Sequence, residues 1–192
     1  MFRRDTGRFS RMLGLLYIAA QYAGSVIGAL IVYNLFEASA RPPLSVERNL
    51  NGTLLLVQAI FQEIIGSMLI TFLYLTQTEE KTKMSGDPAI TTLIIAATYV
   101  AVVAFGENIG VMSGSPYNPA ASFGLFMAII FKGDVGATSN TWLFLLFSYV
   151  GSTLAVLLFE FVYKKAMTNV EEANQEDEET QEHDALISPT TQ

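Results

Sequence analysis

The residues best placed for chemistry are Asn118, Pro119 and Ala120, at the head of an apolar run over residues 121–131. Asn is a preferred N-cap and Pro is favoured at the first helical position, so the triplet predicts the start of a helix. The run holds about a dozen residues, whereas roughly 20 are needed to cross a hydrocarbon core. A short capped helix among longer apolar segments indicates a half-helix that dips into a membrane protein. Because a helix N-terminus carries partial positive charge, we expect this one to face a solute pathway.

Other candidates for reactive chemistry are few. The chain has no cysteine, and its single histidine, His183, lies in an acidic stretch. This excludes disulfides, thiolate metal sites and a thiol nucleophile. The acids Glu63, Glu107 and Glu160 stand near no recognisable partner base, so we expect neither an enzyme nor a metal or other cofactor. No basic patch interleaved with aromatic residues is present, and a nucleic-acid partner is therefore not expected.

Four apolar segments are long enough to position the half-helix within a bilayer. They cover residues 12–36, 54–76, 89–105 and 142–163, in a chain that is 51% hydrophobic with a mean hydropathy of +0.38. The half-helix falls between the third and the fourth. The sequence therefore predicts an all-α, multi-span membrane protein with four transmembrane helices and one re-entrant half-helix.

The charge pattern divides the chain into three parts. Residues 1–11 form an arginine-rich segment, residues 12–165 the membrane domain, and residues 166–192 a tail that holds eight acidic and no basic residues. Low hydrophobicity and like charge predict that this tail is disordered. With four spans, eight Lys and Arg residues fall on the side of the termini and three on the other. We therefore expect cytoplasmic termini, in the plasma membrane or an endomembrane vesicle.

A stripe of small residues lies on the first span. Ala20, Gly24 and Gly28 are four residues apart, a spacing that lets helix backbones approach closely and predicts a packing interface. Glycine is also common in membrane helices without such a role, and this alternative stays open.

Two short motifs concern processing and sorting. Asn51 begins an Asn-Gly-Thr glycosylation sequon in an outer loop, close to the start of the second span. Glu182, followed by Leu186 and Ile187, resembles an acidic dileucine sorting signal in a cytoplasmic tail. Chance matches to such signals are common in acidic tails.

The loop around Asn118 resembles a known family. Residues 113–124, Ser-Gly-Ser-Pro-Tyr-Asn-Pro-Ala-Ala-Ser-Phe-Gly, are similar to the second Asn-Pro-Ala loop of the aquaporins, the major intrinsic protein family. Further similarities lie in three spans: residues 16–21 with Gly24, then Gln58, Glu63 and residues 71–72, then Trp142, Gly151, Ala155 and residues 160–161. The resemblance implies a membrane channel for water or small neutral solutes such as glycerol, urea, ammonia or peroxide. It also implies a homotetramer if the protein is complete.

The resemblance assigns roles to individual residues. It places Asn118, Pro119 and Ala120 at the pore, with Glu63 bonded to backbone around the half-helix loop and Gln21 as a further support. At the selectivity constriction, the family usually has an arginine where this chain has Ala121, and many water-selective members have a histidine where it has Gly106. Ser115 matches a position that also lines the constriction. These departures predict a wider, less polar and less cationic filter.

Nothing in the chain resembles the family's first two spans or its first Asn-Pro-Ala loop. Residues 1–4 resemble the stretch just after that first loop, which leads into the third helix. We expect an incomplete chain. The alternatives are a non-conducting truncated protein, acting as a membrane adaptor or as a regulator of full-length subunits, and two copies that complete each other. A transporter of another family that uses half-helices is less consistent with similarities in three separate spans.

Overall fold

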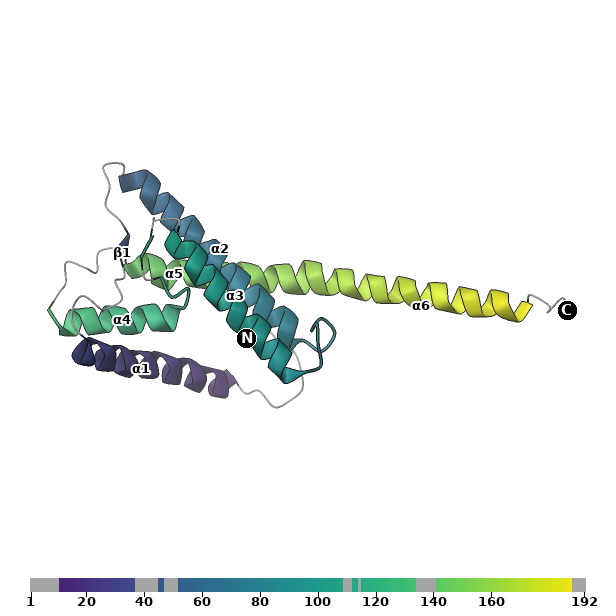
Figure 1. Ribbon diagram of the computed structural model, residues 1–192, viewed down its shortest axis with the longest axis horizontal. Coiled ribbons are helices and arrows are strands. Elements are labelled where there is room, and N and C mark those ends of the chain that lie inside the picture. The colour runs from purple at the N-terminus through teal and green to yellow at the C-terminus, as the bar shows by residue number, and fades with distance from the viewer. Residues whose placement is uncertain are drawn as a thin grey trace.

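The described part of the chain consists mainly of helices (Figure 1). The computed structural model describes residues 11–36, 45–46, 52–108, 112–113, 115–133 and 141–187. The elements are α1 (Arg11–Leu35), β1 (Ser45–Val46), α2 (Gly52–Thr78), α3 (Pro88–Asn108), β2 (Met112–Ser113), α4 (Pro119–Phe131), α5 (Thr141–Leu158), the π-helix η3 (Phe159–Tyr163) and α6 (Lys164–Ile187). The two-residue strands β1 and β2 pair antiparallel, with Ser45 opposite Ser113. The all-α prediction is confirmed, apart from this strand pair.

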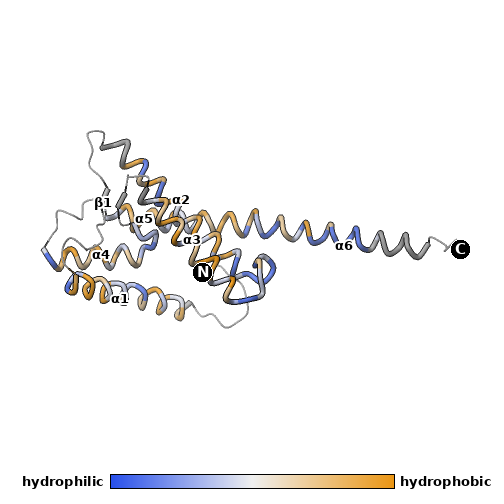
Figure 2. The backbone as a smooth tube through the Cα atoms, in the orientation of Figure 1, coloured by the Kyte–Doolittle hydropathy of each residue, from blue (hydrophilic) through white to orange (hydrophobic). Residues whose placement is uncertain are grey.

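Four helices in the described part of the chain are long and apolar enough to cross a membrane. Three of these stretches are Met12–Leu35, Leu56–Thr78 and Pro88–Gly106, and the fourth begins at Thr141 and continues through η3 into α6. In Figure 2 the apolar residues of α1 to α5 contrast with the hydrophilic α6. Many large apolar side chains on α1, α2 and α3 are exposed. Such faces are expected where lipid or further membrane helices replace water as the surroundings.

The half-helix predicted after Asn118 is confirmed. The helix α4 has 13 residues, with Asn118 as its N-cap and Pro119 in its first turn. The apolar helix Pro119–Phe131 falls short of the length needed for a membrane span. It packs against α1 and α5, and α1 lies beside it in Figure 1.

The helices α2 and α5 make the most extensive contact of the fold. A Cβ atom at Gly151 would meet the Ser67 hydroxyl and the Ile64 carbonyl, so a side chain larger than hydrogen does not fit between these helices. One turn further along, the Thr71 hydroxyl donates to the Ser152 hydroxyl over 2.9 Å. Close approach and interhelical hydrogen bonds are the main sources of helix association in lipid. This contact therefore fixes α5 against α2.

The small-residue stripe of α1 is not used within the described part of the chain. Ala20, Gly24 and Gly28 are exposed, and nothing lies within 4 Å of a Cβ built at Gly24 or Gly28. The close contact of α1 with α4 occurs instead at Ser25, whose carbonyl would collide with a Cβ on Gly124. The packing role of the stripe stays a prediction about a partner beyond these residues.

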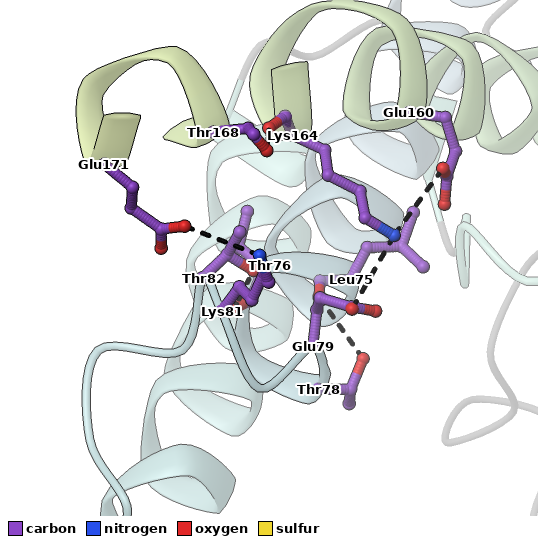
Figure 3. Close-up of polar contacts among 10 residues, drawn as sticks. All are labelled: Leu75, Thr76, Thr78, Glu79, Lys81, Thr82, Glu160, Lys164, Thr168 and Glu171. Atoms are coloured by element: carbon purple, nitrogen blue, oxygen red, sulfur yellow. Dashed lines mark hydrogen bonds and ion pairs between the residues drawn. The ribbon is translucent and has the colours of Figure 1, made fainter. Parts of the chain in front are cut away.

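The acidic tail differs from the prediction of disorder, because α6 extends to Ile187 as a continuation of α5 and η3. Two ion pairs join its first turns to the connection that follows α2 (Figure 3). Lys164 lies 3.6 Å from Glu79, and Lys81 lies 3.5 Å from Glu171. Glu, Gln and Ala are good helix formers, so a helix that has already begun in the membrane domain is easily continued.

The α2 and α5 contact predicts a stability difference between two glycines. We expect Gly151→Ala to lower the free energy of unfolding by about 1–3 kcal/mol, because the new methyl group must displace the Ser67 side chain or the Ile64 backbone. Gly24→Ala is the matched control, since it adds the same methyl group to an exposed helical position. Thermal unfolding in detergent measures both, and equal melting temperatures would contradict this account of the interface.

Candidate functional site

Asn118 caps α4 through its amide oxygen. Its backbone is extended, with φ −143° and ψ 113°, and Oδ1 accepts hydrogen bonds from Ala120 N at 3.0 Å and Ala121 N at 3.4 Å. An asparagine amide has one acceptor oxygen and two N–H donors. Because the oxygen is held by the helix, the NH₂ group points away from it, and the residue is exposed. The cap therefore orients two donors beside the positive end of a helix.

A buried carboxyl group supports the loop that precedes Asn118. Glu63 on α2 is 0% exposed. The Ser115 hydroxyl donates to its Oε2 at 2.5 Å, and the Ser148 hydroxyl of α5 bonds its Oε1. Ser115 Oγ in turn accepts from Tyr117 N at 3.3 Å. Glu63 thus connects α2, α5 and the loop in a single hydrogen-bonded group.

This arrangement bears on two expectations. Among the described residues, Glu63 bonds the hydroxyls of Ser115 and Ser148, and its expected bond to loop backbone stays a prediction. Ser115 is 7% exposed and its hydroxyl faces Glu63, so its place at the constriction also stays a prediction. A buried carboxyl group requires hydrogen-bond donors, and the Ser115 hydroxyl is placed to supply one.

A second support comes from α3. The Tyr99 hydroxyl donates to the carbonyl of Pro116 at 2.9 Å. The sequence analysis missed this residue, although a tyrosine inside an apolar span is a signal, since its hydroxyl needs a partner. Together with the β1 and β2 pairing just before it, the loop is held from several sides.

A groove of about 580 Å³ lies between α2 and α3 and is closed at one side by Tyr117. Its walls are mostly apolar, including Phe61, Ile65 and Phe105, with the polar groups of Gln58, Gln62 and Tyr117 among them. The sequence analysis assigned no role to Tyr117. Its position directly before Asn118 was the only signal for it in the sequence.

Gly106 lines this groove but leaves no open gap. A Cβ atom at Gly106 would meet the Tyr117 hydroxyl, and would lie 2.8 Å from Gln62 Nε2. Tyr117 and Gln62 therefore occupy the space beside Gly106, and the wider filter stays a prediction. Ala121 is a small, half-buried residue in the first turn of α4, and that turn holds no acidic side chain.

The remaining predicted residues are placed as follows. Gln21 is exposed on α1, and its supporting role stays a prediction. Asn51 lies outside the described residues, while Glu182, Leu186 and Ile187 belong to the last turns of α6. Among the residues that the structure describes, no three His, Cys, Asp or Glu side chains are grouped to hold a metal ion.

A capped half-helix among apolar spans, held by a buried carboxyl group, defines a multi-pass membrane protein with a re-entrant loop. The exposed Asn118 places an amide group with two N–H donors beside the positive end of α4. A family profile described as Major intrinsic protein matches residues 5–159. The chain belongs to this family.

Individual relatives are aquaporins. The chain is 31% identical over 147 residues to aquaporin-6 of Rattus norvegicus, and the match covers 76% of this chain and 48% of that protein. It is 30% identical over 160 residues to aquaporin-4 of Bos taurus, and the match covers 82% of this chain and 45% of that protein. It is 27% identical over 159 residues to the probable aquaporin TIP4-1 of Oryza sativa subsp. japonica, and the match covers 82% of this chain and 57% of that protein. The chain thus spans about half the length of the curated relatives it matches.

The hydrogen bonds of Glu63 predict a graded response to substitution. Glu63→Leu leaves the Ser115 hydroxyl without its acceptor and should lower the free energy of unfolding by about 1–3 kcal/mol. Glu63→Gln keeps an oxygen acceptor and should therefore lower the free energy of unfolding by less. Glu160→Gln is the control, since Glu160 lies on the surface and pairs with Lys164 only at 3.9 Å. Thermal unfolding in detergent measures the ranking of the three variants by stability. The prediction is contradicted if Glu63→Leu is as stable as Glu160→Gln.

Proposed function

We propose that the protein carrying this chain is a membrane channel that conducts water and small neutral solutes. The observation that carries this proposal is the Asn118 cap, which fixes the amide oxygen on Ala120 N and leaves the NH₂ group to donate outward. A passing oxygen atom can accept from this group while the helix end favours its partial negative charge. Cations meet the same positive end and are opposed by it.

The solute range follows from the residues around the cap. Ala121 stands where the family resemblance implies an arginine, so the first turn of α4 carries no cationic side chain. Without this positive charge the path attracts anions less and opposes cations less, whereas neutral molecules are less affected. Glycerol, urea, ammonia and peroxide are therefore the proposed solutes beside water.

The chain supplies one half-helix, whereas a closed path needs protein on all sides at membrane depth. We propose that the other side comes from polypeptide outside this chain, in the same protein or in a neighbouring copy, and that the complete protein is a tetramer. The excess of Lys and Arg on the terminal side supports cytoplasmic termini.

The proposal predicts the effect of one isosteric change. Asn118→Asp keeps the capping oxygen but replaces the two amide donors with a carboxylate, so water and glycerol permeability should fall at least tenfold (about 1.4 kcal/mol). Asn174→Asp makes the same change on the exposed face of α6 and should leave permeability unchanged. Stopped-flow swelling of proteoliposomes that hold the full-length protein measures both.

Two outcomes contradict the proposal. If the wild-type protein does not exceed empty liposomes for any tested solute, the chain belongs to a non-conducting adaptor or regulator. If Asn118→Asp conducts as well as the control, the half-helix does not face the path.

A further inference from the structure

A π-helix separates the apolar helix α5 from the polar helix α6. This element, η3, covers Phe159–Tyr163. π-Helical turns are rare, frequently lie at functional sites, and are a recognised cause of helix bending. Phe159 is 1% exposed, and Phe72 of α2 packs edge-on against the rings of Phe159 and Tyr163, with ring centroids 6.3 Å and 5.5 Å apart. The membrane side of the junction is therefore fixed, and bending at η3 would move α6.

The helix α6 contacts the rest of the fold through one narrow face. The partly covered residues after η3 are Lys164, Met167, Thr168 and Glu171, whose spacing of three to four places them on one side of the helix. From Glu172 onward, the side chains that the structure describes are exposed, and α6 continues away from the other helices (Figure 1). A polar helix gains little stability from apolar burial. The position of α6 thus depends on its first two turns.

The surface that receives these turns is the connection after α2, and it is preformed. Thr82 is 6% exposed, and its hydroxyl donates to the Thr76 carbonyl at 3.0 Å. The backbone N–H groups of Thr82 and Lys83 both donate to the Glu79 carbonyl, at 3.1 Å and 3.0 Å. Glu79 and Lys81 are therefore presented to α6 from a hydrogen-bonded turn.

Two ion pairs join this turn to α6 (Figure 3): Lys164 with Glu79 at 3.6 Å, and Lys81 with Glu171 at 3.5 Å. Exposed ion pairs are weak and screened by salt, and the side chains of Lys81 and Glu171 are 58% and 44% exposed. Lys164 also lies 3.9 Å from Glu160, one turn earlier in the chain. It would therefore keep an acidic neighbour if α6 left the turn, which lowers the cost of release.

We propose that α6 is a movable arm, which is held on the connection after α2 by these two ion pairs and swings about η3 when they are broken. The arm responds to ionic strength and to charged molecules that compete for Glu79, Lys81 or Glu171. Its release uncovers the turn and the face of α6 that was docked on it. This inference does not depend on the proposed conduction.

The test is a distance distribution between spin labels, measured by double electron–electron resonance on the full-length protein in nanodiscs. One label is placed at Met84→Cys in the connection and the other at Gln175→Cys on α6, both exposed positions. Glu171→Lys puts like charges together and should at least double the width of the distribution. Raising the salt concentration from 0.01 to 1 M should have the same effect, because the screening length falls from about 30 Å to about 3 Å.

A reversed ion pair and a matched control separate docking from general charge effects. Lys81→Glu combined with Glu171→Lys restores opposite charges and should recover the narrow distribution. Glu172→Lys makes the same charge change one residue further along, at an exposed position, and should leave the distribution unchanged. The inference is overturned if the wild-type distribution is already broad at low salt, if Glu171→Lys leaves it narrow, or if the reversed pair does not recover it.

A second label pair distinguishes swinging of the arm from unfolding of α6. Labels at Lys165→Cys and Glu178→Cys lie about 20 Å apart along a continuous helix, at a rise of about 1.5 Å per residue. Their distance should be the same in the wild-type protein and in Glu171→Lys, because the arm moves as one helix. A broadened distance within α6 would show that the tail unfolds on release, and the movable arm would then be rejected.

Discussion

The fold depends on one buried carboxyl group. Glu63 lies on α2 with no exposed surface, and its two oxygens bond hydroxyls from the loop before α4 and from α5. A carboxyl group inside a membrane domain is costly unless such donors surround it. The same requirement that satisfies Glu63 therefore brings three separate elements together, and the loop before α4 is positioned as a consequence. Ser115 and Tyr117, three and one residues before Asn118, are tied to this group, and their bonds help to place Asn118.

Glycines determine how close the helices come to this centre. Gly151 lets α5 approach α2 at the level of Ile64 and Ser67, next to Glu63 in sequence. Gly66 and Gly106 leave room for Tyr117 on the other side of the loop. The exposed Gly24 and Gly28 have no such neighbour among the described residues. The same residue type thus marks a close contact at some positions and an unused surface at others, and only the surroundings distinguish them.

This distinction explains what the sequence could predict. The four spans follow from length and hydropathy, and the start of α4 follows from Asn118 and Pro119, because these are local signals. The bond of Ser115 to Glu63, the contacts of Tyr117 with Gly66 and Gly106, and the bond from Tyr99 to Pro116 join residues 11 to 52 positions apart, so no local pattern encodes them. The helix α6 was missed because the composition favoured disorder, while its connection to η3 and its ion pairs with Lys81 and Glu79 favour a helix.

A missing side chain is therefore a poor guide to an open path. Gly106 alone indicates a gap. The residue that fills the gap is Tyr117, which lies in the loop 11 positions later in the chain and has a positive φ. The space beside Gly106 is set by the side chains that meet there, Tyr117 and Gln62. A change at any one of them alters the space left by the other two. The space at this position follows from the packing of the group, and the identity of one residue does not determine it.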